Sequence, residues 1–287
     1  MPLAAIITPV YVSSEFPSRL ELFDKTVAGV NRLGSDGTAH LHIIVDDGST
    51  DSEGIRRVLG KYHDRRIRYL RRERRRTDLK TASNALNCGI DAVLYGHEKI
   101  PEYKKIDYVT PLHSDDLMHD IASRAKSLEA ADTGAAIGKI AVLRGDRAAI
   151  HEPDLTMSAR EYVRQGVAPY PVASIMWKPS TLEAMKKHNR ERLPGNQRFD
   201  GVYHPDFVNV EDVLVAKLTA LCLCEANLRI AASGKISMSY RYHQESLRGY
   251  HQDSQRGKTD QDLWNLNTRS MVSMYYELLS WSHCSPE

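Results

Sequence analysis

Residues 41–51 have the sequence LHIIVDDGSTD, a short, mostly apolar run that passes directly into polar residues. A run of this kind is typical of a strand buried on both faces of a sheet. The Asp47-Gly48-Ser49 triplet predicts the turn that ends the strand. Either Thr50 or Asp51 is suited to cap a helix that begins after the turn. We therefore expect a buried strand that ends in two carboxylates and is followed by a helix.

The same alternation of strand and helix patterns continues on both sides of residues 41–51. Apolar runs predict the strands, and apolar residues at helical spacing predict the helices between them. The alternation favours an α/β fold with a mostly parallel central sheet and right-handed connections. The predicted strands cover residues 3–7, 67–70, 106–112 and 135–143, and the predicted helices cover residues 20–30, 55–59, 82–95 and 120–131.

The second half of the chain has a less regular pattern. It predicts strands at residues 174–177 and 236–242 and helices at 179–188 and within 208–224. Residues 260–281 carry apolar side chains at helical spacing and predict an amphipathic C-terminal helix. That helix has an apolar face that would pack on its own domain or on a second copy of the chain.

Composition excludes several classes of protein. The chain has 287 residues, of which 41% are hydrophobic and 26% charged, and these values exclude a collagen-like or wholly disordered chain. The formal net charge is +2, which gives no global attraction for nucleic acid. Residues 65–76 nevertheless hold eight arginines and one glutamate. We interpret most of this segment as a solvated face, and we expect no specific nucleic-acid partner.

The cysteines and the N-terminus bear on the compartment. The four cysteines form no CxxC pair and fit no zinc template, which favours a reduced compartment. Residues 1–12 lack the features of a signal peptide, and no apolar run approaches the roughly 18 residues of a membrane span. We expect a cytoplasmic protein and leave a peripheral membrane contact open.

Three polar clusters follow predicted strands. They are residues 8–11 (TPVY), 46–49 (DDGS) and 113–116 (HSDD). Ligands of open α/β sheets bind beyond the carboxyl ends of the strands. The three clusters therefore predict one ligand site at that edge of the sheet.

Five motifs, in this order along the chain, resemble glycosyltransferase family 2 of the GT-A fold. They are residues 7–11 (ITPVY), 44–51 (IVDDGSTD), 114–116 (SDD), 211–212 (ED) and 240–247 (YRYHQESL). The resemblance covers about residues 3–250. It implies a Rossmann-like GT-A domain over residues 1–250 with a mostly parallel mixed sheet and a helical extension over residues 251–287. Within that domain, residues 1–135 would bind the nucleotide sugar and residues 136–250 would form the acceptor side.

The resemblance implies an inverting glycosyltransferase that uses a nucleotide-diphosphate sugar. Asp47 would accept the N–H of a uracil ring, which makes a UDP-sugar the expected donor, and Tyr11 would stack on the base. The structural alternative for Asp47 is a turn residue before Gly48. The implied nucleotide-binding residues are Thr8, Pro9, Tyr11, Asp46, Asp47, Lys80, Asn84, Ser114 and Asp115.

The Asp115-Asp116 pair would serve a divalent cation, Mn²⁺ or Mg²⁺, because hard cations prefer carboxylate oxygens and bridge to phosphates. By resemblance Asp115 is the direct ligand with His243, and Asp116 holds the donor sugar. The structural alternative is that these aspartates cap the following helix. His113 departs from the pattern, since many family members have an acidic residue there.

Catalysis would need a base near the acceptor hydroxyl. By resemblance Asp212 is the first choice and Glu211 the second, although carboxylates are also ordinary in a first helical turn. Arg241 and Arg248 are candidate phosphate contacts, because a guanidinium pairs well with phosphate oxygens.

The acceptor class stays open among a glycan, a lipid-linked sugar, a peptide and a small molecule, as does a homo-oligomer formed through the C-terminal helix. A sugar nucleotidyltransferase is an alternative function, but residues 7–19 lack the expected glycine-rich loop. A non-catalytic nucleotide-binding or RNA-binding protein is the other alternative.

Overall fold

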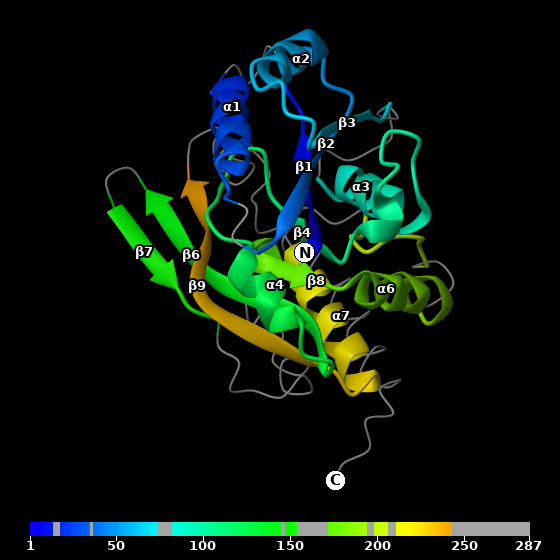
Figure 1. The fold of residues 1–287 in the computed structure, drawn as a ribbon. Helices are drawn as coiled ribbons and strands as arrows, with labels where there is room; N and C mark the ends of the chain where they lie inside the picture. Colours follow the sequence, from blue (N-terminus) through cyan, green and yellow to red (C-terminus); the bar gives the residue numbers. More distant parts are fainter. Residues whose placement is uncertain are drawn as a thin grey trace, which may run out of the picture.

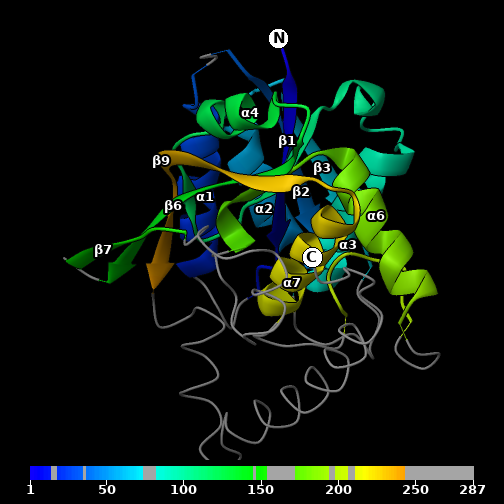
Figure 2. The same ribbon diagram turned by 90° about the horizontal axis from the view of Figure 1, so that it is seen from below.

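In the computed structural model, the described residues are 1–13, 18–34, 37–73, 82–144, 147–153, 172–193, 198–205 and 211–242. They form a nine-stranded sheet with the order β3-β2-β1-β4-β8-β6-β9-β5, and β7 pairs with β6 beside this path. Helices cover both faces of the sheet (Figures 1 and 2). The predicted α/β class and the mostly parallel mixed sheet are confirmed.

The first half of the chain forms the parallel part of the sheet. Strand β1 pairs in parallel with β2 on one side and with β4 on the other, and β2 pairs in parallel with β3. The strands are β1 (Leu3–Val10), β2 (Ala39–Asp46), β3 (Ile67–Arg71) and β4 (Tyr108–Pro111), and the helices are α1 (Ser18–Asn31), α2 (Ser52–Gly60) and α3 (Ser83–Tyr95). The alternation predicted from residues 3–112 is therefore observed.

The core has two sides because every second residue of a strand faces the opposite way. Ile7, Ile43 and Val45 pack against α3 together with residues of the later helices α6 (Pro179–Glu191) and α7 (Glu211–Glu225). Ile44 packs on the other face, against residues of α1 and α2. Helix α3 lies close to the sheet at Gly89, where an added Cβ would come within 2.4 Å of Ile7 Cγ2.

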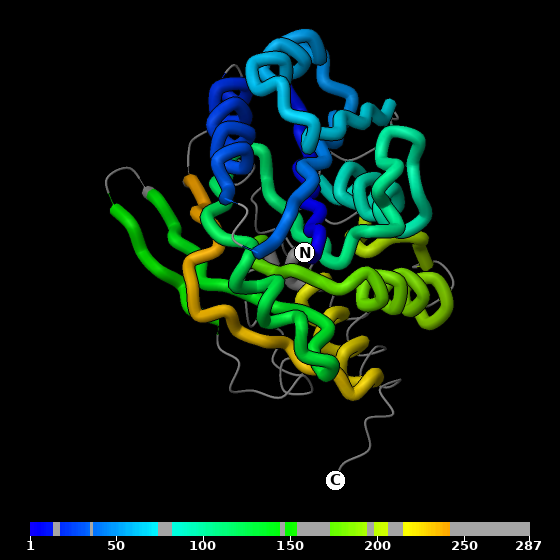
Figure 3. Tube along the Cα trace, viewed as in Figure 1, coloured from blue at the N-terminus to red at the C-terminus, as the bar shows by residue number. Residues whose placement is uncertain are grey.

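The second half adds antiparallel pairs. Strand β8 pairs antiparallel with β4 and β6, whereas β6 pairs in parallel with β9. These elements are β5 (Leu117–Met118), α4 (Ala122–Leu128), β6 (Thr133–Arg144), β7 (Arg147–His151), β8 (Ile175–Trp177), α6 (Pro179–Glu191), α7 (Glu211–Glu225) and β9 (Arg229–Tyr242), with short 3₁₀ turns at Tyr103–Lys105 and Val172–Ser174. Figure 3 shows the β6–β7 hairpin at the side of the molecule away from α3 and α6.

Some predicted bounds were wrong. The helix predicted over residues 120–131 is shorter, and β9 begins seven residues before the strand predicted at 236–242. The predicted C-terminal helix at 260–281, the whole 251–287 extension and the boundary at residue 250 lie outside the described residues. No described helix combines the length and the apolar character needed to cross a membrane.

Candidate functional site

The three polar clusters meet at one edge of the sheet. Val10 at the end of β1 is in register with Asp46 at the end of β2, and Ile7 is in register with Pro111 of β4. The chain continues these pairings beyond the strands, since Asp47 N donates to Val10 O at 2.9 Å. The carboxyl ends of three neighbouring parallel strands thus bring residues 8–11, 46–49 and 113–116 to the same edge, as the sequence predicts.

Asp46 is fully buried and shapes the turn. Its Oδ1 accepts a hydrogen bond from Ser49 N at 2.8 Å, and its Oδ2 accepts one from the Tyr69 hydroxyl at 2.6 Å. Burial and this hydrogen bond raise the pKa of Tyr69 to about 12. Gly48 takes a φ of +72°, a left-handed conformation that glycine adopts without a Cβ clash. Asp46 is therefore held inside the fold, where it fixes the turn that carries Asp47.

Asp47 forms an ion pair with Arg72, which directly follows β3. The Asp47 residue is 5% exposed, and the Arg72 side chain is 17% exposed. The sequence predicts Lys80 as a basic nucleotide contact but does not single out Arg72. Because β3 is parallel to β2 and in register with it, the end of β3 places Arg72 beside the end of β2.

Thr8 lies inside the sheet. Its Oγ1 is 2.8 Å from Nε2 of His42 on the adjacent strand, and both residues are buried. Burial lowers the pKa of His42 to about 3, so the ring is neutral at neutral pH. Pro9 is buried as well, whereas Tyr11 is partly exposed just beyond β1. Of residues 8–11, Tyr11 is therefore the one with a side chain partly open to solvent.

The Asp115-Asp116 pair divides between two environments. Asp116 is fully buried, and its Oδ1 accepts a hydrogen bond from Arg241 N of β9 at 3.0 Å. Asp115, like Ser114 and His113, is partly exposed. The helix-capping alternative is wrong, because α4 begins at Ala122 and its N-cap is Ile121. The contact of Asp116 with a donor sugar stays a prediction.

Arg241 connects three parts of the chain. Its guanidinium donates to the backbone oxygen of Asp115, to Leu22 O at 3.1 Å and to Thr26 Oγ1 at 3.1 Å. Thr26 Oγ1 in turn donates to Asp116 O at 2.7 Å. Burial lowers the pKa of Arg241, and the two aspartates oppose that shift. These bonds hold the loop that carries Asp115 against α1 and β9, so Arg241 supports the site in addition to its predicted role as a phosphate contact.

Other predicted residues are only partly described. Glu211 and Asp212 begin α7, as predicted, but their side chains lie outside the description. Lys80, His243 and Arg248 lie outside the described residues altogether. Among the residues that are described, no group of three or more His, Cys, Asp or Glu side chains could hold a metal ion.

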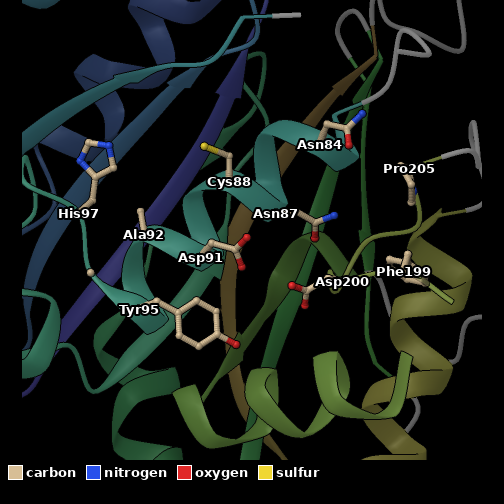
Figure 4. Close-up of a pocket in the computed structure, with 11 residues that line it drawn as sticks. Asn84, Asn87, Cys88, Asp91, Ala92, Tyr95, His97, Phe199, Asp200 and Pro205 are labelled. Atoms are coloured by element: carbon tan, nitrogen blue, oxygen red, sulfur yellow. The ribbon is translucent and has the colours of Figure 1, made fainter. Parts of the chain in front are cut away.

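A cavity of about 560 Å³ that the sequence analysis did not foresee lies beside α3 (Figure 4). One wall is α3, from Asn84 to Tyr95, and the other is the segment Phe199–Pro205. Asn84, a predicted nucleotide-binding residue, lines the end nearest the carboxyl edge of the sheet. No local motif marks this cavity, because its second wall is more than 100 residues away in the sequence.

No protein-family model matches the chain, and no curated protein matches it at a significant level. Solved structures do match. S. aureus TarS 1-349 in complex with UDP-GlcNAc has a TM-score of 0.61 at 14% identity, covering 96% of this chain and 66% of that one. The structure of S. aureus TarS 1-349 without a stated ligand has a TM-score of 0.56 at 13% identity, covering 98% of this chain and 73% of that one. Its UDP complex has a TM-score of 0.53 at 13% identity, covering 96% of this chain and 72% of that one.

The chain therefore spans just under two thirds of the length of the first of these structures. At such low identity, the likeness concerns the course of the backbone. The chain has a GT-A-like glycosyltransferase fold.

Proposed function

We propose that the protein is an inverting glycosyltransferase that moves a sugar from a UDP-sugar to an acceptor hydroxyl. One observation carries the proposal: Tyr11, Asp47 and Asp115 lie beyond the carboxyl ends of neighbouring strands in this fold. The likeness to a protein crystallised with UDP-GlcNAc and with UDP supports it. The resemblance to family 2 remains part of the proposal.

The nucleotide would bind across the ends of β1, β2 and β3. The Tyr11 ring would stack on the base, and the Asp47 carboxylate would accept the ring N–H of uracil. Arg72 holds its guanidinium beside Asp47, where a positive charge also favours an approaching diphosphate. Asp46 and Thr8 contribute indirectly, because their side chains are bonded within the fold and position the residues next to them.

The protein residues present fit a divalent cation if the diphosphate supplies most of the ligands of the cation. Mg²⁺ and Mn²⁺ sites of this kind use one or two protein carboxylates together with phosphate oxygens. Asp115 is the more exposed carboxylate of its pair, so Asp115 with His243 would hold the ion. When bound, a cation there supplies Lewis-acid neutralisation of the departing diphosphate.

Asp212 is proposed as the general base, with Glu211 as the second choice. Both belong to the first turn of α7, where the helix dipole favours a carboxylate in its ionised form. The base takes the proton of the acceptor hydroxyl as its oxygen attacks the anomeric carbon opposite the diphosphate. Arg241, Arg248 and Lys80 are proposed to balance phosphate charge, and Asp116 is proposed to contact the donor sugar.

A panel of UDP-, GDP- and TDP-sugars tests this proposal, with release of the nucleoside diphosphate as the readout. We expect release from UDP-sugars in the presence of Mn²⁺. Asp212→Asn should lower the rate by about 100-fold or more, within the usual range for general-base catalysis, and should still bind UDP. Glu129→Gln removes an exposed carboxylate that has no ion partner among the described residues, and it should match the unaltered protein.

Two results would contradict the proposal. One is the absence of diphosphate release from every sugar nucleotide. The other is pyrophosphate-dependent formation of a nucleoside triphosphate, which would indicate a sugar nucleotidyltransferase.

A further inference from the structure

The cavity beside α3 is an elongated groove that begins at Asn84, a predicted nucleotide-binding residue. Asn84 and Tyr95, at its two ends, are eleven residues apart on one helix. At 1.5 Å per residue the groove therefore extends about 16 Å along α3. Asn84 and Pro205 lie at one mouth of the groove (Figure 4). The groove thus follows α3 from a predicted nucleotide contact to the far end of the helix.

The outer wall is fixed in place by two buried or partly buried amides. Asn87 Oδ1 accepts hydrogen bonds from Val202 N and Tyr203 N, each at 2.9 Å, and its Nδ2 donates to Tyr203 O at 2.7 Å. Asn189 of α6 donates to Gly201 O at 2.9 Å. These bonds satisfy the backbone of the wall segment, so the groove is a preformed feature of the fold.

Two carboxylates that line the groove are held by Lys186 of α6, whose side chain is 3% exposed. Its ammonium pairs with Asp91 of α3 and lies 3.3 Å from Asp200 Oδ1 on the opposite wall. The same ammonium lies 4.6 Å from the centre of the Tyr95 ring. Figure 4 shows Asp91 and Asp200 directed toward each other across the groove. One buried cation therefore holds two carboxylates and an aromatic ring in a set arrangement.

The exposed chemistry of the groove suits hydroxyl groups. The Asp91 and Asp200 side chains are 43% and 62% exposed, and carboxylates accept strong hydrogen bonds from hydroxyls. Tyr95 is 58% exposed and offers an aromatic face, and Asn84 offers an amide at the mouth. Because two carboxylates face one ammonium, these three side chains carry a net negative charge, which disfavours an anionic ligand.

We propose that this groove binds a neutral, polyhydroxylated saccharide chain, and that this chain is the acceptor. The claim that this saccharide is the acceptor rests on the proposed function. The saccharide lies along α3 with its far units against Tyr95 and between the two aspartates, and its reacting end lies at the Asn84 mouth. Of the four acceptor classes left open by the sequence, the groove selects a glycan of several units.

The test uses the full chain on an array of immobilised neutral and acidic oligosaccharides of one to six units, with calorimetric titration of UDP on the same preparations. We expect binding to neutral oligosaccharides of several units, and a loss of at least tenfold in Tyr95→Ala. Ile150→Ala is the matched control, because Ile150 is 57% exposed on β7, away from the groove. The loss in Tyr95→Ala should be selective, with UDP affinity retained.

Asp200→Asn provides a second variant that keeps the size of the side chain. It should also weaken glycan binding, and its melting temperature reports whether the fold is intact. The inference is overturned if no neutral oligosaccharide binds, if acidic glycans bind better, or if Tyr95→Ala binds as well as Ile150→Ala. If the unaltered protein binds neutral oligosaccharides but does not bind UDP, the proposed function is overturned instead. The two failures are therefore distinguishable.

Discussion

Two buried histidines of β2 are held inside the fold, and this has consequences for stability. His42 is paired with Thr8, and burial holds its pKa at about 3, below the 6.5 of an exposed histidine. His40 on the same strand has a pKa of about 4, with burial as the main cause and Arg66 adding to it. Below pH 6.5 the unfolded chain therefore binds more protons than the folded chain. Stability should be constant with respect to these groups above that pH and should fall as the pH falls.

His42→Gln tests this at a single residue, since the amide can keep a hydrogen bond to Thr8. Between pH 7 and pH 5 the unaltered protein should lose about 2 kcal/mol of unfolding free energy at this site, because the unfolded histidine takes up a proton that the folded one does not. Over the same pH range, the loss of unfolding free energy in His42→Gln should be smaller than in the unaltered protein by that amount. Urea denaturation at both pH values measures the two losses. Equal losses in the two proteins would show that His42 is not held neutral.

Among the described residues, Arg124 is the largest charged side chain that is fully buried. Its guanidinium donates to Ser174 O at 2.8 Å, Thr110 Oγ1 at 3.0 Å and Asp120 O at 2.9 Å. Arg124→Met would remove the donor of these three hydrogen bonds, at a cost of about 3 kcal/mol. Arg56→Met, on the exposed side of α2, should change stability by less than about 0.5 kcal/mol. Chemical denaturation of both variants measures the difference, and similar values would refute a structural role for Arg124.

Sequence patterns predicted which segments meet at the carboxyl edge of the sheet, but they did not predict the contacts of the individual side chains. Asp46 and Asp47 could be placed at a strand end because apolar residues precede a turn signal. Both carboxylates are buried, but their partners depend on the turn and on strand register: Asp46 is bonded to Tyr69 and Ser49, and Asp47 is paired with Arg72. Lys186 and Asp200 carried no local signal, since their importance comes from packing against α3.

Among the elements, α3 shows how one small residue sets a packing distance. An added Cβ at Gly89 would lie 2.4 Å from Ile7 Cγ2 and 3.2 Å from Val45 Cγ2, both on strands beneath the helix. Gly89→Ala should therefore force α3 outward and destabilise the protein by about 1–3 kcal/mol despite alanine's higher helix propensity. Gly60→Ala is the matched control, because no atom lies within 4 Å of the added Cβ. In thermal unfolding, Gly60→Ala should have a higher melting temperature than Gly89→Ala. The reverse order would contradict this packing.

The elements that the sequence missed lack the signals that prediction uses. All five residues of β7 are exposed, so no apolar alternation marks the strand. Strand β5 has two residues, too few for any periodicity. Strand β9 begins at Arg229, where register shifts against β6 interrupt a regular pattern. The parallel strands β1 and β2 were predictable because burial on both faces requires mostly apolar runs.

At the scale of the whole molecule, a ligand that binds the folded state must stabilise it. UDP at 100 times its dissociation constant should add about 2.7 kcal/mol and raise the melting temperature. The rise should be reduced in Asp115→Ala when Mn²⁺ is present, because the proposed ion links Asp115 to the diphosphate. Differential scanning calorimetry with and without UDP measures it. An identical rise in Asp115→Ala would contradict a role for Asp115.

The central claim is that a nucleoside diphosphate binds at the carboxyl edge of the sheet through Asp47. Calorimetric titration of UDP with Mn²⁺ into the unaltered protein, Asp47→Asn and Glu129→Gln tests it most directly. We predict that Asp47→Asn binds roughly 10- to 100-fold more weakly, the value of a hydrogen bond to a charged group, and that Glu129→Gln binds normally. No UDP binding by the unaltered protein, or equal binding by Asp47→Asn, would contradict the claim.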